Sequence, residues 1–454
     1  MLAHDLRLAF RSIKRTSGVS TLMILALATG IAASVITITL WHTKSGNPIW
    51  WKNDALRVVL VDSRLENPAA DAQVRHPEYP PFLMSYRDAQ AIYQSRIPMR
   101  SVMMAASKRV LLPHDDRVRP RRVSVRLATA DFFDMFDAPF QYGAGWSRQD
   151  DEAPAAIAVL SEATNDRVFH GENSVGRSID LGGIGYRVLG VLKDWRPQPR
   201  FYDLRAAFAP PEDVFIPFAW AEAQQLEITG GGYCEATNSI VSGFTELTAA
   251  NCSWVQLWAE FASAAQRAEY QAFIDNFARE QKRLGRYSRP LNNRLVDVAS
   301  WLDMNDVVGD ESRTLAVLAL LFLVVCLLNT TGLMLAKFLG TASSAGIRRA
   351  LGATRGDIIR QHLTEVLVLG VVGGALGLVM AKLGLLLIRE LLFMPIAIAA
   401  RSEQSIEIAR ALSHIDLEMV GVALLLSLLA GVLAGLYPAW RIGRISPSAF
   451  LKAR

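Results

Sequence analysis

Four long apolar stretches dominate the hydrophobic pattern of the chain. They cover residues 19–41, 314–336, 366–388 and 420–440, and Lys382 is the one charged residue within them. A helix that crosses the hydrocarbon core of a bilayer needs about 20 mostly apolar residues. The pattern therefore predicts a membrane protein with four transmembrane α-helices. The first stretch is too long for the apolar core of a signal peptide, which favours an uncleaved anchor.

Short alternating segments replace the apolar runs between the first and second predicted helices. Residues 122–127 alternate polar and apolar positions, as a half-buried strand does. Residues 162–169 and 267–284 have the spacing of amphipathic helices. Strands and helices that follow one another with brief turns indicate a large α+β domain. The Gly-, Thr-, Asn- and Ser-rich stretch 229–253 marks a second subdomain, which we expect to be inserted into the first.

Basic residues set the predicted orientation, because loops rich in Lys and Arg stay in the cytoplasm. Such residues cluster before the first helix, between the second and third, and after the fourth. Both termini are therefore expected in the cytoplasm, with the large domain outside. The predicted order is an amphipathic helix (1–18), transmembrane helix 1 (19–42), the outer domain (43–312, with its inserted subdomain at about 217–290), transmembrane helix 2 (313–338), a cytoplasmic loop (339–361), transmembrane helix 3 (362–390), an outer loop (391–418), transmembrane helix 4 (419–440) and a tail (441–454).

Composition excludes several classes of function. The net charge is only +5, which gives little support for nucleic-acid binding. The chain has no GxxxxGK[ST] phosphate loop, no GxSxG elbow and no HExxH motif. We therefore expect no catalytic site, no metal site and no cofactor held by this chain.

Two of the three cysteines, Cys234 and Cys252, fall in the predicted outer domain. An exported domain meets an oxidising environment, so a disulfide between them is expected, with two unpaired thiols as the alternative. Closing the loop between Cys234 and Cys252 would stabilise the domain by roughly 3 kcal/mol in the chain-entropy model. Cys326 lies within the second predicted membrane helix, where packing is its expected role.

Small residues at four-residue spacing recur in the last two predicted membrane helices. This small-xxx-small pattern lets helix backbones approach closely, within one subunit or between two. Asn329, Thr330 and Thr331 are polar residues in the second predicted helix. We expect them to form hydrogen bonds to other helices, with a contact to substrate as the alternative. The glycines that we expect to pack helices are Gly370, Gly373, Gly374, Gly377, Gly431 and Gly435.

A short basic segment separates the second and third predicted membrane helices. Its position predicts a small cytoplasmic helix that contacts a partner protein. The segment consists of Gly346, Ile347, Arg348, Arg349, Ala350, Leu351, Gly352, Ala353, Thr354 and Arg355.

This segment and its surroundings resemble the FtsX-type permease module of ABC transporters. Residues 435–441, followed by Ser446-Pro447, resemble the closing signature of that module. The outer domain is similar to the periplasmic core domain of the MacB-type exporters. The matching residues are 326–329, 333–337, 347–355, 359–361 and 364–365 for the permease module, and 131–134, 158–161, 176–177 and 190–192 for the core domain.

The resemblance implies a type VII ABC architecture in the bacterial inner membrane, with residues 43–312 in the periplasm. Residues 346–355 would be the coupling helix that contacts a separate ATPase subunit, which holds ATP and Mg. The chain would not itself be an enzyme. Its expected partners are that ATPase, a second permease copy or a paralogue, membrane lipids, and a periplasmic adaptor with an outer-membrane channel.

Three functions are compatible with this resemblance. The first is export of a peptide, an antibiotic or a similar compound, driven by movement of the outer domain. The second is a regulator or sensor that controls a periplasmic partner such as a cell-wall hydrolase, and the third is lipoprotein extraction. One departure concerns the acidic residue that the family usually has just before the coupling helix, because residues 343–346 of this chain are Ser-Ser-Ala-Gly.

Overall fold

The chain forms two compact units, which we describe separately. The helical unit comprises Met1–Gly46 and Val308–Arg454, and the outer domain comprises Asn47–Val307. The structure, a computed structural model, describes residues 2–66, 76–112, 119–209, 211–229, 232–234, 239–241, 243–249, 252–307, 310–340, 347–348, 351–388, 421, 425, 429, 432–433, 435–438 and 440–441.

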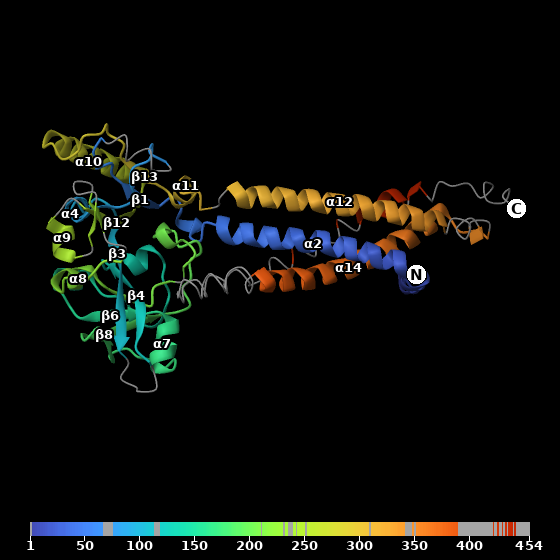
Figure 1. Cartoon of the computed structure of the whole chain (residues 1–454), viewed down its shortest axis with the longest axis horizontal. Helices are drawn as coiled ribbons and strands as arrows, with labels where there is room; N and C mark the ends of the chain where they lie inside the picture. The colour runs from blue at the N-terminus through green and yellow to red at the C-terminus, as the bar shows by residue number, and fades with distance from the viewer. Residues whose placement is uncertain are drawn as a thin grey trace. The chain divides into compact units, whose positions relative to one another are not determined.

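The helical unit consists of long helices that run side by side (Figure 1). They are α2 (Ser17–Ser45), α12 (Asp310–Gly340) and α14 (Arg355–Ile388), preceded by the shorter α1 (Leu2–Arg15). Among the described residues, three helices are long and apolar enough to cross a membrane. They agree with the first three predicted spans. The fourth predicted span, 419–440, lies mostly outside the described residues, and the loop 391–418 lies wholly outside them.

The outer domain is built on a mixed β-sheet with helices on both of its faces (Figure 1). Along its main path the strand order is β11-β10-β12-β3-β4-β9-β6-β8-β5. Most neighbours are antiparallel, but β9 runs parallel to β4 and β8 runs parallel to β6. The strands are β1 (Leu56–Leu60), β2 (Met84–Ser85), β3 (Arg100–Leu112), β4 (Arg121–Ala128), β5 (Phe140–Gly143), β6 (Ile157–Leu160), β7 (Ser178–Leu181), β8 (Gly185–Leu192), β9 (Val214–Pro217), β10 (Gly232–Cys234), β11 (Ser239–Val241), β12 (Cys252–Glu260) and β13 (Arg294–Val296).

The helices of the outer domain are short, except α10. Several begin with a side chain that accepts a hydrogen bond from the first turn, such as Ser85 before α4 and Ser161 before α7. They are α4 (Tyr86–Tyr93), α5 (Phe132–Met135), α6 (Arg148–Glu152), α7 (Glu162–Phe169), α8 (Phe218–Ala223), α9 (Phe244–Ala249), α10 (Ala264–Arg283) and α11 (Val298–Met304), with single 3₁₀ turns at Trp50–Lys52 and Leu204–Ala206.

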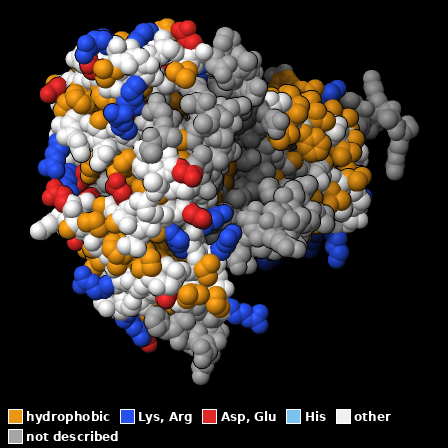
Figure 2. All heavy atoms as spheres, turned by 60° about the vertical axis from the view of Figure 1, so that its left-hand side comes forward, with side chains coloured by type: hydrophobic (Ala, Val, Ile, Leu, Met, Phe, Trp, Pro, Cys, Tyr) orange, Lys and Arg blue, Asp and Glu red, His pale blue; other side chains and the backbone are white. Residues whose placement is uncertain are grey.

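Both faces of the sheet carry a hydrophobic core, and the central strands show why. On β1, Val59 belongs to one core, whereas Val58 and Leu60 belong to the other. Neighbouring side chains of a strand point to opposite faces, so a fully apolar strand fits a sheet that is covered on both sides. The outward surface is mixed: basic, acidic and hydrophobic side chains are interspersed on the face of the outer domain seen in Figure 2.

A buried charge network is centred on Arg126 of β4. The Arg126 side chain is 0% exposed, and its guanidinium donates to Glu212 Oε1 at 2.9 Å and to Asp203 Oδ2 at 2.8 Å. Arg200 pairs with Glu212 at 3.2 Å, and Arg205 pairs with Asp203 at 2.8 Å. Burial opposes ionisation of Asp203 and Glu212. The arginines around them, Arg126 first, together outweigh this effect, so the pKa of each carboxyl group is lowered.

Two segments of the outer domain complete its regular structure. The chain leaves β13 at Val296 and enters α11, because Asp297 accepts from Ser300 N at 3.0 Å and caps that helix. The stretch 229–253 contains β10, β11 and α9. The hydrophobic core that contains Val59 of β1 also contains Trp254, which lies in the predicted inserted subdomain. The boundaries of that subdomain stay a prediction.

Candidate functional site

The segment between α12 and α14 exposes apolar side chains beside a basic one. Ile347 is 62% exposed and Leu351 is 82% exposed, with Arg348 also exposed between them. Two backbone bonds form a turn here: Leu351 N donates to Ile347 O at 3.0 Å, and Ala353 N donates to Arg348 O at 3.1 Å. An exposed turn with large apolar side chains has the chemistry of a contact surface.

The end of this segment is fixed to the helical unit. Gly352 has φ +104°, a backbone conformation that favours glycine and lets the chain turn from the exposed surface toward α14. Ala353 then packs against the core of the helical unit. Thr354 Oγ1 accepts from Asp357 N at 3.2 Å, and the Asp357 carboxylate accepts from Thr354 N at 3.0 Å, which caps α14. Of the predicted coupling residues, Gly346, Arg349 and Ala350 lie outside the described residues, and Arg355 begins α14.

A buried ion pair links the two helices that flank this segment. Lys337 Nζ on α12 lies 2.6 Å from Glu365 Oε1 on α14, with side chains 1% and 2% exposed. Lys337 Nζ also donates to Ser20 Oγ of α2 at 2.9 Å, and Ser12 Oγ of α1 donates to Glu365 Oε1 at 2.8 Å. The four side chains therefore join four helices. Sequence analysis missed this cluster as a site, although Lys337 and Glu365 are conspicuous as charged residues beside apolar runs.

Two of the predicted packing glycines lie against α2. A Cβ added at Gly377 would lie 3.0 Å from Ala28 O, and one at Gly373 would lie 3.1 Å from Leu27 Cβ. Gly370 and Gly374 are buried, and Gly431 is outside the described residues. A Cβ at Gly435 would overlap Val366. These contacts are within one subunit.

The expected hydrogen bonds from Thr330 and Thr331 to other helices are not formed. Thr330 Oγ1 donates to Cys326 O at 2.7 Å, and Thr331 Oγ1 donates to Leu327 O at 2.8 Å. A threonine in a helix can satisfy its hydroxyl group with the carbonyl one turn earlier, so no second helix is needed.

The two outer cysteines occupy opposite positions on paired strands. β10 and β12 are antiparallel, and their register sets Cys234 directly opposite Cys252, which is buried. Residues facing each other across an antiparallel pair are close enough for a bridge. This register supports the predicted disulfide, which stays a proposal.

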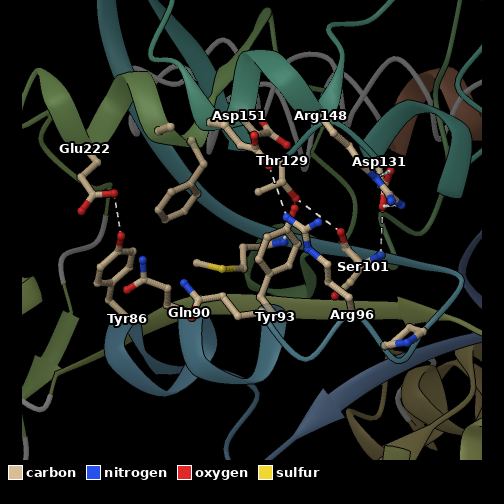
Figure 3. Close-up of a pocket in the computed structure, with 16 residues that line it drawn as sticks. Tyr86, Gln90, Tyr93, Arg96, Ser101, Thr129, Asp131, Arg148, Asp151 and Glu222 are labelled. Carbon is tan, nitrogen blue, oxygen red and sulfur yellow. Dashed lines mark hydrogen bonds and ion pairs between the residues drawn. The ribbon is translucent and has the colours of Figure 1, made fainter.

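The outer domain also contains a cleft of about 260 Å³ between α4 and the helices α6 and α8. Figure 3 shows Tyr86 and Tyr93 of α4 on one side, facing Glu222 and Asp151 on the other. Glu222 Oε2 accepts from the Tyr86 hydroxyl at 2.6 Å. Asp151 accepts from Ala130 N at 2.7 Å, and burial raises the pKa of its carboxyl group to about 7. The cleft thus combines aromatic rings with carboxyl groups.

Family models match the chain in two parts. Residues 20–276 match the MacB-like periplasmic core domain, and residues 316–447 match the FtsX-like permease C-terminal domain. The first match alone covers more than half of the chain. The protein belongs to the MacB/FtsX-type ABC transporter permeases. Its resemblance to this family, inferred from short motifs, is therefore confirmed.

Relatives of this permease differ in length. The uncharacterized ABC transporter permease YvrN of Bacillus subtilis is 23% identical over 457 residues, which covers 98% of each chain. The pyoverdine export ATP-binding/permease protein PvdT of Pseudomonas aeruginosa is 26% identical over 71% of this chain, and the match covers 41% of that protein. The periplasmic region of MacB from Actinobacillus actinomycetemcomitans superposes with a TM-score of 0.37 at 12% identity, covering 57% of this chain and 95% of that structure.

Proposed function

We propose that this permease couples ATP hydrolysis by a separate ATPase subunit to movement of its outer domain. The observation that carries the proposal is the exposed turn around Arg348, with Ile347 and Leu351 beside it. ATP and Mg would be bound by the partner, because this chain has no phosphate loop of the GxxxxGK[ST] type. A turn that is exposed at its tip and packed at Ala353 is suited to transmit a partner's movement into the helices.

The proposed location is the bacterial inner membrane, with both termini in the cytoplasm and residues 43–312 in the periplasm. Arg348 and the N-terminal residues Arg7, Arg11 and Lys14 support this orientation, because they would share the cytoplasmic side. A fourth span over residues 419–440 completes the topology. A second permease copy or a paralogue would pair with this chain.

The proposed transport function is export of a peptide, an antibiotic or a similar compound. Relatives named for pyoverdine export and macrolide export support this choice, although both also have ATP-binding in their names. A periplasmic adaptor and an outer-membrane channel would complete such an exporter. The lipoprotein-extraction alternative has no feature of its own in its favour here.

The cleft of the outer domain supports one alternative function, which is regulation or sensing. Its aromatic rings and carboxyl groups, including Tyr93 and Asp151, form a concave surface suited to a ligand or a partner segment. In that case the outer domain would control a periplasmic partner such as a cell-wall hydrolase. Recovery of such a hydrolase, in place of an adaptor, would favour this reading.

The test of the proposed coupling is purification of the tagged chain from its native host in mild detergent, with mass spectrometry of the proteins that accompany it. We expect an ATPase subunit with a phosphate loop. The double variant Arg348→Glu/Leu351→Ser should lose most of that subunit, because both charge and apolar contact are removed. Lys382→Glu, at an exposed position near the other end of α14, is the control. Equal recovery in the double variant would contradict the assigned contact.

A further inference from the structure

The pair formed by Lys337 and Glu365 occupies a mechanically important position. Lys337 lies in the last turn of α12, immediately before the segment that carries Arg348, and Glu365 lies on the helix that follows it. Phe338 and Val366, their neighbours in sequence, belong to the same apolar core that Ala353 contacts. Both ends of the exposed segment are thus anchored around this ion pair.

Stability alone is a poor explanation for a buried ion pair at this place. Removing two charges from water costs about as much as their attraction returns, and apolar replacements are often equally stable. An ion pair differs from apolar packing in being directional, because it fixes one atom against another. A buried pair of this kind is best attested as a device that sets the register between helices.

The two serines extend this fixed register to the remaining helices. Ser20 joins α2 to Lys337, and Ser12 joins α1 to Glu365. Apolar surfaces can slide past one another, whereas this chain of contacts must break or move as a unit. His362 lies nearby, with its ring centroid 4.1 Å from that of Phe338, and closes the cluster on the α14 side.

We propose that Lys337 and Glu365 are positioning residues that make α1, α2, α12 and α14 respond together when a partner displaces the segment around Arg348. This inference rests on the proposed function, because it assumes an ATPase at that segment. It adds which contacts transmit the displacement. The pair would act on coupling between hydrolysis and outer-domain movement, not on ATPase binding.

The test compares Lys337→Gln and Glu365→Gln with the wild type, each purified as the full chain with its ATPase. Hydrogen exchange of the outer domain is measured with and without ATP, together with kcat and KM for ATP. We expect the recovery of the ATPase and the KM for ATP to stay close to wild type. The difference in hydrogen exchange of the outer domain between the states with and without ATP should fall by about fivefold or more, since coupling between sites is typically at least this strong. Lys382→Gln removes an exposed charge from α14 and should change nothing.

The exchanged pair Lys337→Glu/Glu365→Lys separates register from general packing. Serine hydroxyls both donate and accept, so Ser12 and Ser20 can serve the reversed pair. We expect the exchanged pair to restore most of the ATP-dependent change. If a single variant fails to fold, the ATP-dependent hydrogen exchange of the exchanged pair still tests the proposal.

Three outcomes would overturn the inference. A normal ATP-dependent change in both single variants would show that the pair transmits nothing, and so would a folded exchanged pair without restoration. Both results leave the proposed function intact. Absence of any ATPase from the wild-type preparation would instead remove the proposed function, and the coupling role with it.

Discussion

Replacing Arg126 by methionine should strongly destabilise the outer domain. The substitution keeps an apolar stem but leaves Asp203 and Glu212 buried without their shared partner. Removing one member of a buried ion pair costs about 3–5 kcal/mol. Arg200 and Arg205 remain beside these carboxylates, so the lower end, about 3 kcal/mol, is expected. For a domain of this size each kcal/mol lowers Tm by about 2–4 °C, which predicts a decrease of roughly 6–12 °C.

Tryptophan fluorescence of the full chain in detergent can follow this unfolding, since Trp254 and Trp258 are buried in the outer domain. Arg122→Met is the matched control, because Arg122 lies four residues earlier on the same strand and is exposed. Surface substitutions usually change the free energy of unfolding by less than about 0.5 kcal/mol. Equal Tm values for the Arg126 and Arg122 variants would refute the argument that the buried charges depend on Arg126.

Lowering the pH should weaken the same buried charge network around Arg126. The pKa values of Asp203 and Glu212 are lowered in the folded domain, so their stabilising contribution is complete above the unfolded pKa of about 4. It is lost as the pH falls below that value and the carboxylates become protonated. In Arg126→Met the lowered pKa values lose their main cause, and we expect a smaller drop in Tm between neutral and acidic pH. An unchanged drop would contradict this assignment.

Three further predictions concern packing, the disulfide and the cleft. Gly377→Leu should destabilise the helical unit by about 1–3 kcal/mol, because a side chain there meets α2. Gly332→Leu, which has open space around it, should not, and the measurement is the thermal unfolding of helical circular dichroism. Thiol titration of the denatured, unreduced chain should find one free thiol if Cys234 and Cys252 are bridged, and three if they are not. Burial raises the pKa of Asp151 to about 7, so the outer domain should lose stability as the pH rises from about 4 to 7, and Asp151→Asn should flatten this part of the pH profile of Tm.

Local signals predicted much of the outer domain. Helix α7 occupies residues 162–169 as expected, because its spacing is helical and Ser161 caps it at Thr164 N. The turn between β7 and β8 also depends on a local feature, because its adjacent glycines, Gly182 and Gly183, adopt φ +69° and +88°, which favour glycine. Such features depend on residues close in sequence. The chain alone therefore contains the information needed to place them.

Long-range burial was harder to predict. Arg122, Ser124 and Arg126 form the polar side of the alternating pattern on β4, which favours an exposed face. Arg122 is exposed, but Arg126 is 0% exposed because acidic residues from distant parts of the chain cover it. Periodicity reports the polarity of a face and cannot reveal which other segments pack on it. The ion pair between Lys337 and Glu365 was not predicted for the same reason.

The basic residues around the proposed coupling segment fall into two classes. The charge of Lys337 is balanced inside the helical unit by Glu365. Arg348, on the exposed turn, instead donates to the neutral Gln361, and among the described residues no carboxylate pairs with it. The segment before this turn also lacks the acidic residue that the family usually has there. A charge that the described residues leave unbalanced at an exposed apolar turn is available to an acidic surface. The chemistry therefore favours a partner that supplies carboxylates to Arg348 and an apolar pocket to Leu351.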